Sequence, residues 1–222
     1  MGNSDSPIAT SRRTRAIRFV LAVLALGAWF WTQSLIGHKP SSSEHVGDGI
    51  HALTASMHQF FVDNPRAADA LLIVGSAFID LLALFLFASA IFGPTIRPFL
   101  GMLILFVLRQ ICQAFCSLPP PEGMIWHYPG FPSLLVTYGV SNDLFFSGHT
   151  AIAVYGATEL GRLGRSWLTI LGVLIAIFEV ATVLILRAHY TMDVFAGAMT
   201  ALFVAAIVDR IATPCDRAMA RI

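Results

Sequence analysis

Long apolar stretches that contain almost no charge constrain this chain more than any other feature. Between residues 168 and 186 the only charged residue is Glu179, and between residues 70 and 92 it is Asp80. A bilayer hydrocarbon core about 30 Å thick requires about 20 apolar residues in each spanning helix. Only 12% of the chain is charged, against about 25% in average soluble domains. The sequence therefore predicts a multi-pass integral membrane protein.

Six apolar stretches predict the fold class, an all-α integral membrane protein with a six-helix bundle. They run over Ile17–Ile36, Ala67–Phe92, Pro98–Cys116, His149–Leu163, Leu168–Arg187 and Tyr190–Ile211. The fourth is the weakest, because a polar break at residues 161–166 ends it early. The predicted domains are a disordered cytoplasmic N-terminus at 1–16, a membrane domain at 17–212 and a cytoplasmic tail at 213–222. The arginines before the first stretch resemble a signal peptide, but no clean cleavage site follows, so we expect a retained anchor.

Positive charges in the connecting segments predict how the chain is oriented. With the N-terminus inside, ten arginines flank the inner ends of the spans and three basic residues flank the outer ends. The inner residues are Arg12, Arg13, Arg15, Arg18, Arg97, Arg162, Arg165, Arg210, Arg217 and Arg221, and the outer ones are Lys39, Arg66 and Arg187. Cytoplasmic loops are enriched in Lys and Arg. Both termini are therefore predicted to be cytoplasmic, with two long outer loops at about residues 37–66 and 117–148.

The first outer loop contains four histidines, which could be metal ligands: His38, His45, His51 and His58. A second interpretation fits better. From Ile50 onward, apolar residues recur at helical spacing, at Leu53, Met57, Phe60 and Phe61, and the histidines occupy other positions. This pattern is typical of an amphipathic helix on the outer leaflet. The second outer loop is rich in proline and aromatic residues, which favours a stiff lid at the level of the lipid headgroups.

Composition also disfavours several classes of function. The net charge is +1 and no basic patch is interleaved with aromatic residues, so nucleic acid is not an expected partner. The three cysteines, Cys112, Cys116 and Cys215, do not predict a disulfide framework. Packing between closely spaced helices explains Cys112 and Cys116 better than metal ligation does. We expect no metal and no cofactor, and the sequence makes no prediction of the oligomeric state.

Two polar segments lead into apolar stretches and are the candidates for chemistry. Residues 142–150 lead into the fourth stretch and residues 187–193 lead into the sixth. Polar groups at membrane depth are costly and usually functional. With the predicted orientation, both segments lie at the outer face, 40 residues apart.

The residue types in these segments predict phosphoryl transfer. His189 and Asp193 are four residues apart, so on a helix they share a face, and Asp193 can accept a hydrogen bond from one ring nitrogen of His189. The other nitrogen would stay basic. Ser147 and Gly148, with His149, would start a helix whose free N–H groups and positive dipole end suit a phosphate oxygen. Two histidines, one oriented by a carboxylate, form a minimal pair of nucleophile and acid.

These motifs resemble the second and third signature motifs of the type 2 phosphatidic acid phosphatase superfamily, most closely its sphingomyelin synthase branch. Residues Ser141 through Thr150 are similar to that branch's Cys-Gly-Asp-x-x-x-Ser-Gly-His-Thr. Residues His189 through Val194 match its His-Tyr-Thr-x-Asp-Val. Arg109 followed by residues 117–121 resembles a third stretch of the branch. The resemblance implies six spans, a metal-independent reaction and an active site on the exoplasmic face, periplasmic or lumenal.

The resemblance also implies roles for individual residues. His189 would attack the phosphorus of a lipid phosphodiester to give a phosphohistidine, Asp193 would orient His189, and His149 would protonate the leaving alcohol. Substrate contacts are implied for Asp143, Ser147, Gly148, Tyr190 and Arg109.

The acceptor of the headgroup stays open at this point. A phospholipid donor with ceramide or diacylglycerol as acceptor would make the chain a phosphotransferase, and water would make it a phospholipase C-like hydrolase. A lipid phosphate phosphatase of the same superfamily is an alternative. A six-span lipid-binding scaffold or transporter without turnover is another.

Two features bear on these alternatives. The phosphatase branch has a Lys-x6-Arg-Pro motif, but here Ala90 stands seven residues before Arg97, and Thr182-Val183 replaces a Ser-Arg pair. A phosphomonoester dianion would lack its guanidinium clamp, which favours a diester.

The second feature is a set of charges submerged in the apolar stretches: Asp80, Arg109, Glu159 and Glu179. We expect Arg109 to pair with Asp80 or Glu179, with Glu159 as a further candidate, unless Glu179 lines the cavity.

Overall fold

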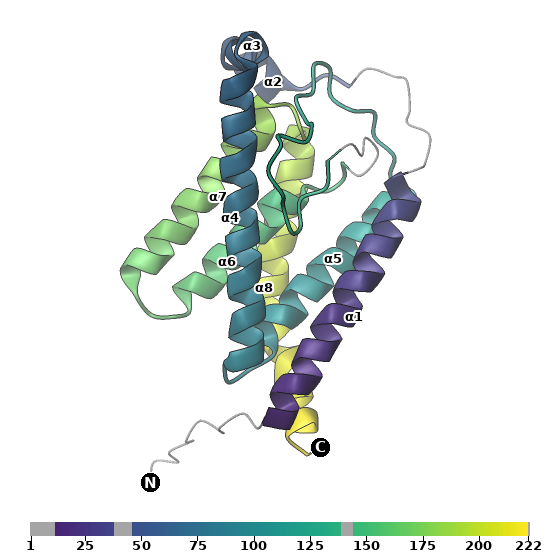
Figure 1. The fold of residues 1–222 in the computed structure, drawn as a ribbon, viewed down its shortest axis with the longest axis vertical. Coiled ribbons are helices and arrows are strands. Elements are labelled where there is room, and N and C mark those ends of the chain that lie inside the picture. The colour runs from purple at the N-terminus through teal and green to yellow at the C-terminus, as the bar shows by residue number, and fades with distance from the viewer. Residues whose placement is uncertain (1–11, 38–45, 139–143, 222) are drawn as a thin grey trace.

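The structure is a computed structural model that describes residues 12–37, 46–138 and 144–221. Within them, every regular element is a helix, as the sequence predicts. The helices are α1 (Arg12–Gly37), α2 (Gly49–Leu53), α3 (Ala55–Asp63), α4 (Pro65–Phe92), α5 (Arg97–Phe115), α6 (Gly148–Gly161), α7 (Ser166–Ile185) and α8 (Thr191–Ala220). Figure 1 shows the long helices side by side as a bundle, with α2 and α3 at one end. Residues 1–11 of the predicted disordered N-terminus and the histidines His38 and His45 lie outside the described residues, whereas residues 12–16 belong to α1.

Five of the described helices, α1, α4, α5, α7 and α8, are long and apolar enough to cross a membrane. The predicted fourth span corresponds to α6, which has 14 residues. At 1.5 Å per residue, α6 is about 21 Å long and falls short of a hydrocarbon core about 30 Å thick. Five candidate spans are therefore found, and a sixth crossing stays a prediction.

Helix α6 lies inside the bundle, where it packs against α7 and α8. Its approach to α7 depends on Gly172, because a Cβ atom there would lie 2.7 Å from the Cα atom of Ala157. Small residues at helix crossings allow this close backbone approach in membrane proteins. Ala153 and Tyr155 of α6 are fully buried. The position of α6 fixes the position of His149, which is the second residue of this helix.

The ends of α1 and α8 extend beyond the predicted boundaries. Helix α1 begins at Arg12, and α8 continues to Ala220, so most of the predicted cytoplasmic tail at 213–222 is helical. An ion pair joins the two ends: Arg18 Nη2 lies 3.0 Å from Asp216 Oδ1. The Asp216 carboxylate also accepts hydrogen bonds from the Thr95 hydroxyl and the Ile96 N–H. The α4–α5 turn, the start of α1 and the end of α8 are thereby held together.

A second polar cluster lies towards the same end of the bundle. Arg97 Nη2 lies 2.6 Å from Glu159 Oε2, and Arg162 Nη1 lies 3.0 Å from Asp209 Oδ2. Glu159 is thus paired with Arg97, so the suggestion that it pairs with Arg109 is wrong. Figure 1 shows this end opposite α2, α3 and the loop that precedes α6. The two-ended arrangement agrees with the charge pattern, and the side of the membrane that each end faces stays a prediction.

The first outer loop forms two short helices, α2 and α3, which meet at Thr54 and replace the single amphipathic helix that was predicted. Leu53 is 79% exposed, and Met57 and Phe60 are also exposed, whereas His51 and His58 are buried. Both histidines point to the protein: His51 Nε2 lies 3.0 Å from the His189 carbonyl oxygen, and His58 Nδ1 lies 2.8 Å from the Ile185 carbonyl oxygen. The apolar side chains thus face away from the protein, as the sequence pattern predicts.

Candidate active site

His189 lies in the short turn that joins α7 to α8. Tyr190 is the N-cap of α8, and its N–H donates a 2.9 Å hydrogen bond to Asp193 Oδ2. An acidic residue in the first turn also compensates the positive end of the helix dipole. His189 Nδ1 lies 3.7 Å from Asp193 Oδ2, which is within ion-pair distance but beyond hydrogen-bond length. The two side chains share a face as predicted, but the predicted hydrogen bond is not made, and Asp193 Oδ2 accepts from the Tyr190 N–H instead.

His149 is positioned by the start of α6. Ser147 is the N-cap, and its hydroxyl oxygen accepts a 3.3 Å hydrogen bond from the Thr150 N–H and a 3.1 Å hydrogen bond from the Thr150 hydroxyl. Serine is a preferred N-cap because its side chain satisfies an N–H group of the first turn. The predicted helix start at Ser147, Gly148 and His149 is confirmed. Gly148 and His149 are therefore the first two helical residues, whose N–H groups have no partner within the helix.

The two helix starts contact each other directly. The Ser147 N–H donates a 3.1 Å hydrogen bond to the backbone carbonyl of Asp193. Gly197, one turn further along α8, allows this approach, because a Cβ atom there would lie 2.6 Å from the Ser147 carbonyl oxygen. Two motifs 40 residues apart in the sequence are thus joined through their backbones.

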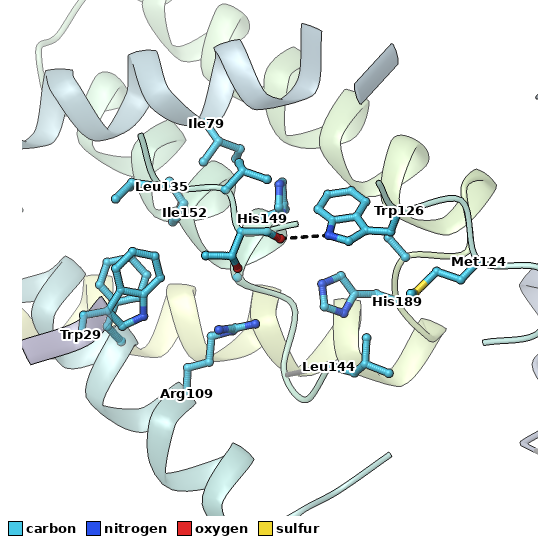
Figure 2. Close-up of a pocket in the computed structure, with 15 residues that line it drawn as sticks. Trp29, Ile79, Arg109, Met124, Trp126, Leu135, Leu144, His149, Ile152 and His189 are labelled. Atoms are coloured by element: carbon cyan, nitrogen blue, oxygen red, sulfur yellow. Dashed lines mark hydrogen bonds between the residues drawn. The ribbon is translucent and has the colours of Figure 1, made fainter. Parts of the chain in front are cut away.

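One pocket contains both histidines (Figure 2). It has a volume of about 50 Å³, and its lining includes Arg109, Trp126, Gly148, His149 and His189. The pocket lies at the end of the bundle opposite the α6–α7 turn, which carries Arg162 and Arg165. This placement agrees with the prediction that both histidines lie at the same edge of the protein.

Several polar atoms around the pocket are buried without a hydrogen-bond partner among the described residues. They are His149 Nε2, His189 Nδ1 and Asp193 Oδ1. Buried polar atoms are almost always hydrogen-bonded, so a cluster of exceptions is a mark of a functional site. The arrangement can place two imidazoles beside a bound phosphate, with the Asp193 carboxylate on the far side of the His189 ring.

Arg109 reaches the pocket from α5. Its Nε donates a 2.9 Å hydrogen bond to the Phe146 carbonyl oxygen, and its Nη1 lies 3.4 Å from Gln33 Oε1. A Cβ atom on Gly148 would lie only 3.2 Å from Arg109 Nε, so the absence of a side chain at Gly148 makes room for the guanidinium. The expected pairing of Arg109 with Asp80 or Glu179 is wrong, and its positive charge lies beside the two histidines instead.

Asp80 and Glu179, the two carboxylates expected to pair with Arg109, contact other groups. Asp80 accepts hydrogen bonds from the Ser133 hydroxyl at 3.0 Å and from the N–H groups of Leu134 and Leu135 at 2.8 and 3.0 Å. Glu179 is fully buried beside Gly75, and neither of its carboxyl oxygens has a hydrogen-bond partner among the described residues. Asp80 therefore anchors a loop, and Glu179 does not line the pocket that holds the histidines.

The loop between α5 and α6 covers the pocket with Met124, Trp126 and residues 135–137. The Trp126 ring meets the His149 ring edge-on, with centroids 5.1 Å apart, and Trp126 Nε1 donates to the Thr137 carbonyl. The same loop is tied to the α7–α8 turn, because the Ile125 N–H donates a 2.8 Å hydrogen bond to the Leu186 carbonyl. This arrangement agrees with the lid that the sequence suggests.

Not every predicted substrate-binding residue lines the pocket. Tyr190 and Ser147 do not line the pocket: the Tyr190 hydroxyl donates to the Pro119 carbonyl, and the Ser147 hydroxyl caps α6. Asp143 lies outside the described residues. Of the predicted substrate-binding residues, the structure brings Gly148 and Arg109 to the pocket beside the histidines.

Asp48 was missed by the sequence reasoning. Its carboxylate is the N-cap of α2 and also accepts hydrogen bonds from the Thr191 N–H at 2.6 Å and the Thr191 hydroxyl at 2.7 Å. Burial raises the pKa of the Asp48 carboxyl, but hydrogen bonds from Thr191 and the His51 N–H outweigh burial, and the pKa lies below its ordinary value. An Asp before Gly49 is a local N-cap signal. Its contact with Thr191, 143 residues away, has no local signal.

The fold and the pocket define a helical membrane protein with a two-histidine site at one end of its bundle. A family model described as AtPDCT1/2 matches residues 48–210, and the chain belongs to this family. The matched range contains both histidine motifs, Asp48 and the loop over the pocket.

Two curated relatives come from Arabidopsis thaliana. The chain is 24% identical over 158 residues to phosphatidylcholine:diacylglycerol cholinephosphotransferase 1, covering 71% of this chain and 51% of the relative. It is 22% identical over 181 residues to phosphatidylcholine:diacylglycerol cholinephosphotransferase 2, covering 81% and 60% respectively. The chain thus spans between half and three fifths of the length of these relatives. The prediction of a lipid phosphotransferase agrees with these relatives, and the resemblance to the sphingomyelin synthase branch stays a prediction.

Proposed function

We propose that the chain is a membrane enzyme that transfers a phosphocholine headgroup from phosphatidylcholine to diacylglycerol. The observation that carries the proposal is that His149 and His189, from two separate motifs, line one pocket beside Arg109. The relatives' names supply the two lipids. Of the acceptors that the sequence leaves open, diacylglycerol is favoured over ceramide and water for the same reason.

The first step forms a bond between His189 and phosphorus. His189 Nδ1 faces Asp193 at 3.7 Å, so Nε2 is the nitrogen available to a substrate. Nε2 attacks the phosphorus of phosphatidylcholine, and the bond from phosphorus to the glycerol oxygen breaks. His149 donates its proton to that oxygen, and diacylglycerol leaves. The negative charge of Asp193 stabilises the cationic form of His189 that develops.

In the second step, His149 acts as a base and His189 is the leaving group. The hydroxyl of a new diacylglycerol attacks the phosphorus, His149 accepts the hydroxyl proton, and the bond between His189 and phosphorus breaks. General acid and base catalysis by one histidine in the two half-reactions is typical of a double-displacement mechanism. The product is phosphatidylcholine with the acyl chains of the acceptor.

The charge in the pocket suits a diester. A phosphodiester has one negative charge, and Arg109 supplies one positive charge beside the helix start at Gly148. Arg97, the remnant of the phosphatase motif, is paired with Glu159 at the opposite end of the bundle. Arg97 is therefore not placed to contact a dianionic monoester at the histidines, which disfavours a lipid phosphate phosphatase.

Residues 116–138 cover the pocket, with Met124 and Trp126 in its lining, so a headgroup has to pass this loop to reach the histidines. We propose that residues 116–138 move to admit the headgroup, acting as a lid over the histidines. Lid motion that excludes water would also favour transfer to a lipid hydroxyl over hydrolysis.

The test is a transfer assay with the full chain in phosphatidylcholine vesicles. Labelled diacylglycerol is added, and we expect the label to appear in phosphatidylcholine without release of free phosphocholine. A His149→Ala variant should lose at least about a hundredfold in rate. His127→Ala is the control, because His127 lies in the same loop region but is exposed and pairs with Asp69. Phosphocholine release without labelled phosphatidylcholine would contradict the proposal and indicate a hydrolase.

We further propose that the pocket opens to the exoplasmic side of the membrane, as the charge pattern predicts. The test uses two cysteine variants, Leu53→Cys on α2 and Leu163→Cys in the α6–α7 turn. Both leucines are exposed, and they lie towards opposite ends of the bundle. In intact cells, an impermeant thiol reagent should label Leu53→Cys and not Leu163→Cys. The reverse labelling pattern would contradict this orientation.

A further inference from the structure

An apolar groove lies between α1 and α5 and shares lining residues with the pocket that contains the histidines. Its volume is about 270 Å³, and its lining is almost entirely apolar, with Ala25, Phe99, Met102 and Leu103 among its walls. A second apolar groove of about 530 Å³ continues towards the other end of the bundle, and Ala25, Phe99 and Leu103 belong to both. The two grooves therefore form one surface along α1 and α5, named here the α1–α5 groove.

The α1–α5 groove adjoins the pocket at two aromatic residues. Trp29 and Phe106 line both the pocket and the groove, and their rings stack with centroids 4.8 Å apart and planes 19° apart. Figure 2 shows Trp29 at the margin of the pocket, on the side of Arg109. A molecule whose polar end lies at the histidines would therefore reach the groove by passing this aromatic pair.

Trp29 also has an unused hydrogen-bond donor at this junction. The side chain is 8% exposed, and its indole Nε1 is buried without a hydrogen-bond partner among the described residues. A buried indole N–H normally finds an acceptor. In a glycerophospholipid, the ester carbonyls lie between the phosphate and the acyl chains, so they are suitable acceptors at the point where Trp29 lies.

We propose that the α1–α5 groove binds an acyl chain of the phospholipid whose headgroup occupies the two-histidine pocket. This inference rests on the proposed function for the identity of the headgroup. From Trp29 to Leu21 the groove follows eight residues of α1, or about 12 Å at 1.5 Å per residue. One leaflet of the hydrocarbon core is about 15 Å thick. The groove therefore has a length suited to a chain from a single leaflet.

The docking of α1 leaves room for such a chain to enter from the bilayer. Among the described side chains of α1, one narrow stripe is buried: Arg18, Ala22, Trp29 and Gln33. Their neighbours Phe19, Val23 and Phe30 are exposed. Helix α1 is thus held at its two ends, by the Asp216 ion pair and by Gln33 near Arg109, with apolar groove walls between them.

Another apolar groove, between α6 and α7, provides a matched control. It has a volume of about 480 Å³ and is lined by Ala176, Val173 and Val154 among others, but it shares no residue with the pocket. Ala25 and Ala176 are both half-buried alanines that line a groove on a spanning helix. Ala25→Phe would fill the α1–α5 groove, and Ala176→Phe would fill the groove that is not connected to the pocket.

The kinetic test compares phosphatidylcholine donors with six-carbon and sixteen-carbon chains in mixed micelles. We expect Ala25→Phe to raise the KM for the long-chain donor at least about fivefold and to leave the KM for the short-chain donor unchanged. Ala176→Phe should change neither value. Equal effects of Ala25→Phe on both donors, or no effect on either, would overturn the proposal.

A binding measurement separates this proposal from the proposed function. Phosphatidylcholine with a photoreactive diazirine near the end of one acyl chain is crosslinked to the full chain, and labelled peptides are mapped by mass spectrometry. We expect labelling on residues 21–32 and 99–111, reduced by Ala25→Phe and not by Ala176→Phe. This labelling in a protein without transfer activity would support the groove and refute the proposed function. Transfer activity with labelling only on α6 and α7 would refute the groove.

Discussion

The backbone N–H of Ser147 donates a hydrogen bond to the backbone carbonyl of Asp193 at 3.1 Å. Ser147 caps the helix that carries His149, and Asp193 lies in the first turn of the helix that follows His189. A backbone hydrogen bond therefore joins the two segments that carry the histidines.

Gly197→Ala tests this contact. The added Cβ atom would lie 2.6 Å from the Ser147 carbonyl oxygen, and backbone cannot move aside as a flexible side chain can. Overpacking of this kind costs about 1–3 kcal/mol. We expect a lower thermal midpoint in detergent and a transfer rate reduced at least about tenfold. Gly27→Ala in α1 is the control, because a Cβ atom there meets nothing within 4 Å. Equal thermal midpoints and equal transfer rates in the two variants would contradict the claim that Gly197 allows the contact with Ser147.

Asp193→Asn separates the charge of Asp193 from its role as a helix cap. The amide oxygen can still accept the hydrogen bond from the Tyr190 N–H, so the fold should be retained. The negative charge 3.7 Å from His189 Nδ1 is lost. We expect the transfer rate to fall by about a hundredfold, in the range of losses for general acid and base catalysis, with little change in thermal midpoint. If the transfer rate of Asp193→Asn fell only in proportion to a lower thermal midpoint, Asp193 would have a structural role alone.

Asp48→Asn tests the anchor between α2 and the start of α8. The pKa of Asp48 lies below its ordinary value of 3.8, so the carboxylate stays ionised down to a lower pH than usual. Its stabilisation is complete above that ordinary value and is lost only as the pH falls through the lowered pKa. We expect Asp48→Asn to reduce the transfer rate about tenfold, since hydrogen bonds to charged groups contribute about 1.5–3 kcal/mol.

The pH profile gives the control for this variant. Because Asp48 does not change its protonation between about pH 5 and 8, the shape of the rate profile in this range should be the same in Asp48→Asn and in the unchanged chain. Leu53→Ala, at an exposed position of the same helix, should leave both rate and profile unchanged. A shifted profile in Asp48→Asn would mean that Asp48 itself takes part in proton transfer.

Asp80→Asn tests how the lid is anchored. Asp80 accepts hydrogen bonds from Ser133, Leu134 and Leu135, and an amide can accept only with its oxygen. We expect the loop to exchange its amide hydrogens faster and to admit water, so that phosphocholine release rises relative to transfer. Asp69→Asn, which removes an exposed contact of the same loop with His127, should have the smaller effect. Unchanged exchange at residues 133–135 would contradict the anchoring role.

Much of the fold could be predicted from the sequence, because apolar length and period are local properties. The ranges of α4, α5 and α7 differ from the predicted stretches by only a few residues. The helix start at Ser147 has a local N-cap signal, and the i,i+4 spacing of His189 and Asp193 places them on one face. Both histidine motifs could therefore be assigned without any tertiary information.

Contacts between distant segments could not be predicted in this way. Arg109, Asp80 and Glu159 are each a charge in an apolar stretch, and nothing local distinguishes their possible partners. In the structure, Glu159 forms an ion pair with Arg97, and Asp80 accepts hydrogen bonds from the loop that covers the pocket. Arg109 lines the pocket itself. Near its end, α8 contacts Arg18 through Asp216, and the two residues lie 198 positions apart in the sequence. Such pairings are determined by helix packing, which a single sequence does not show.

The most direct measurement of the central claim is the capture of phosphorus on His189. The full chain is incubated with phosphatidylcholine labelled in its phosphate, without diacylglycerol, and quenched under alkaline conditions that preserve phosphohistidine. We predict an acid-labile label on the peptide that contains His189, which is released as phosphatidylcholine when diacylglycerol is added before the quench. The label should persist in His127→Ala and be absent from His189→Ala. Full transfer activity in His189→Ala, or a label on another residue, would contradict the account.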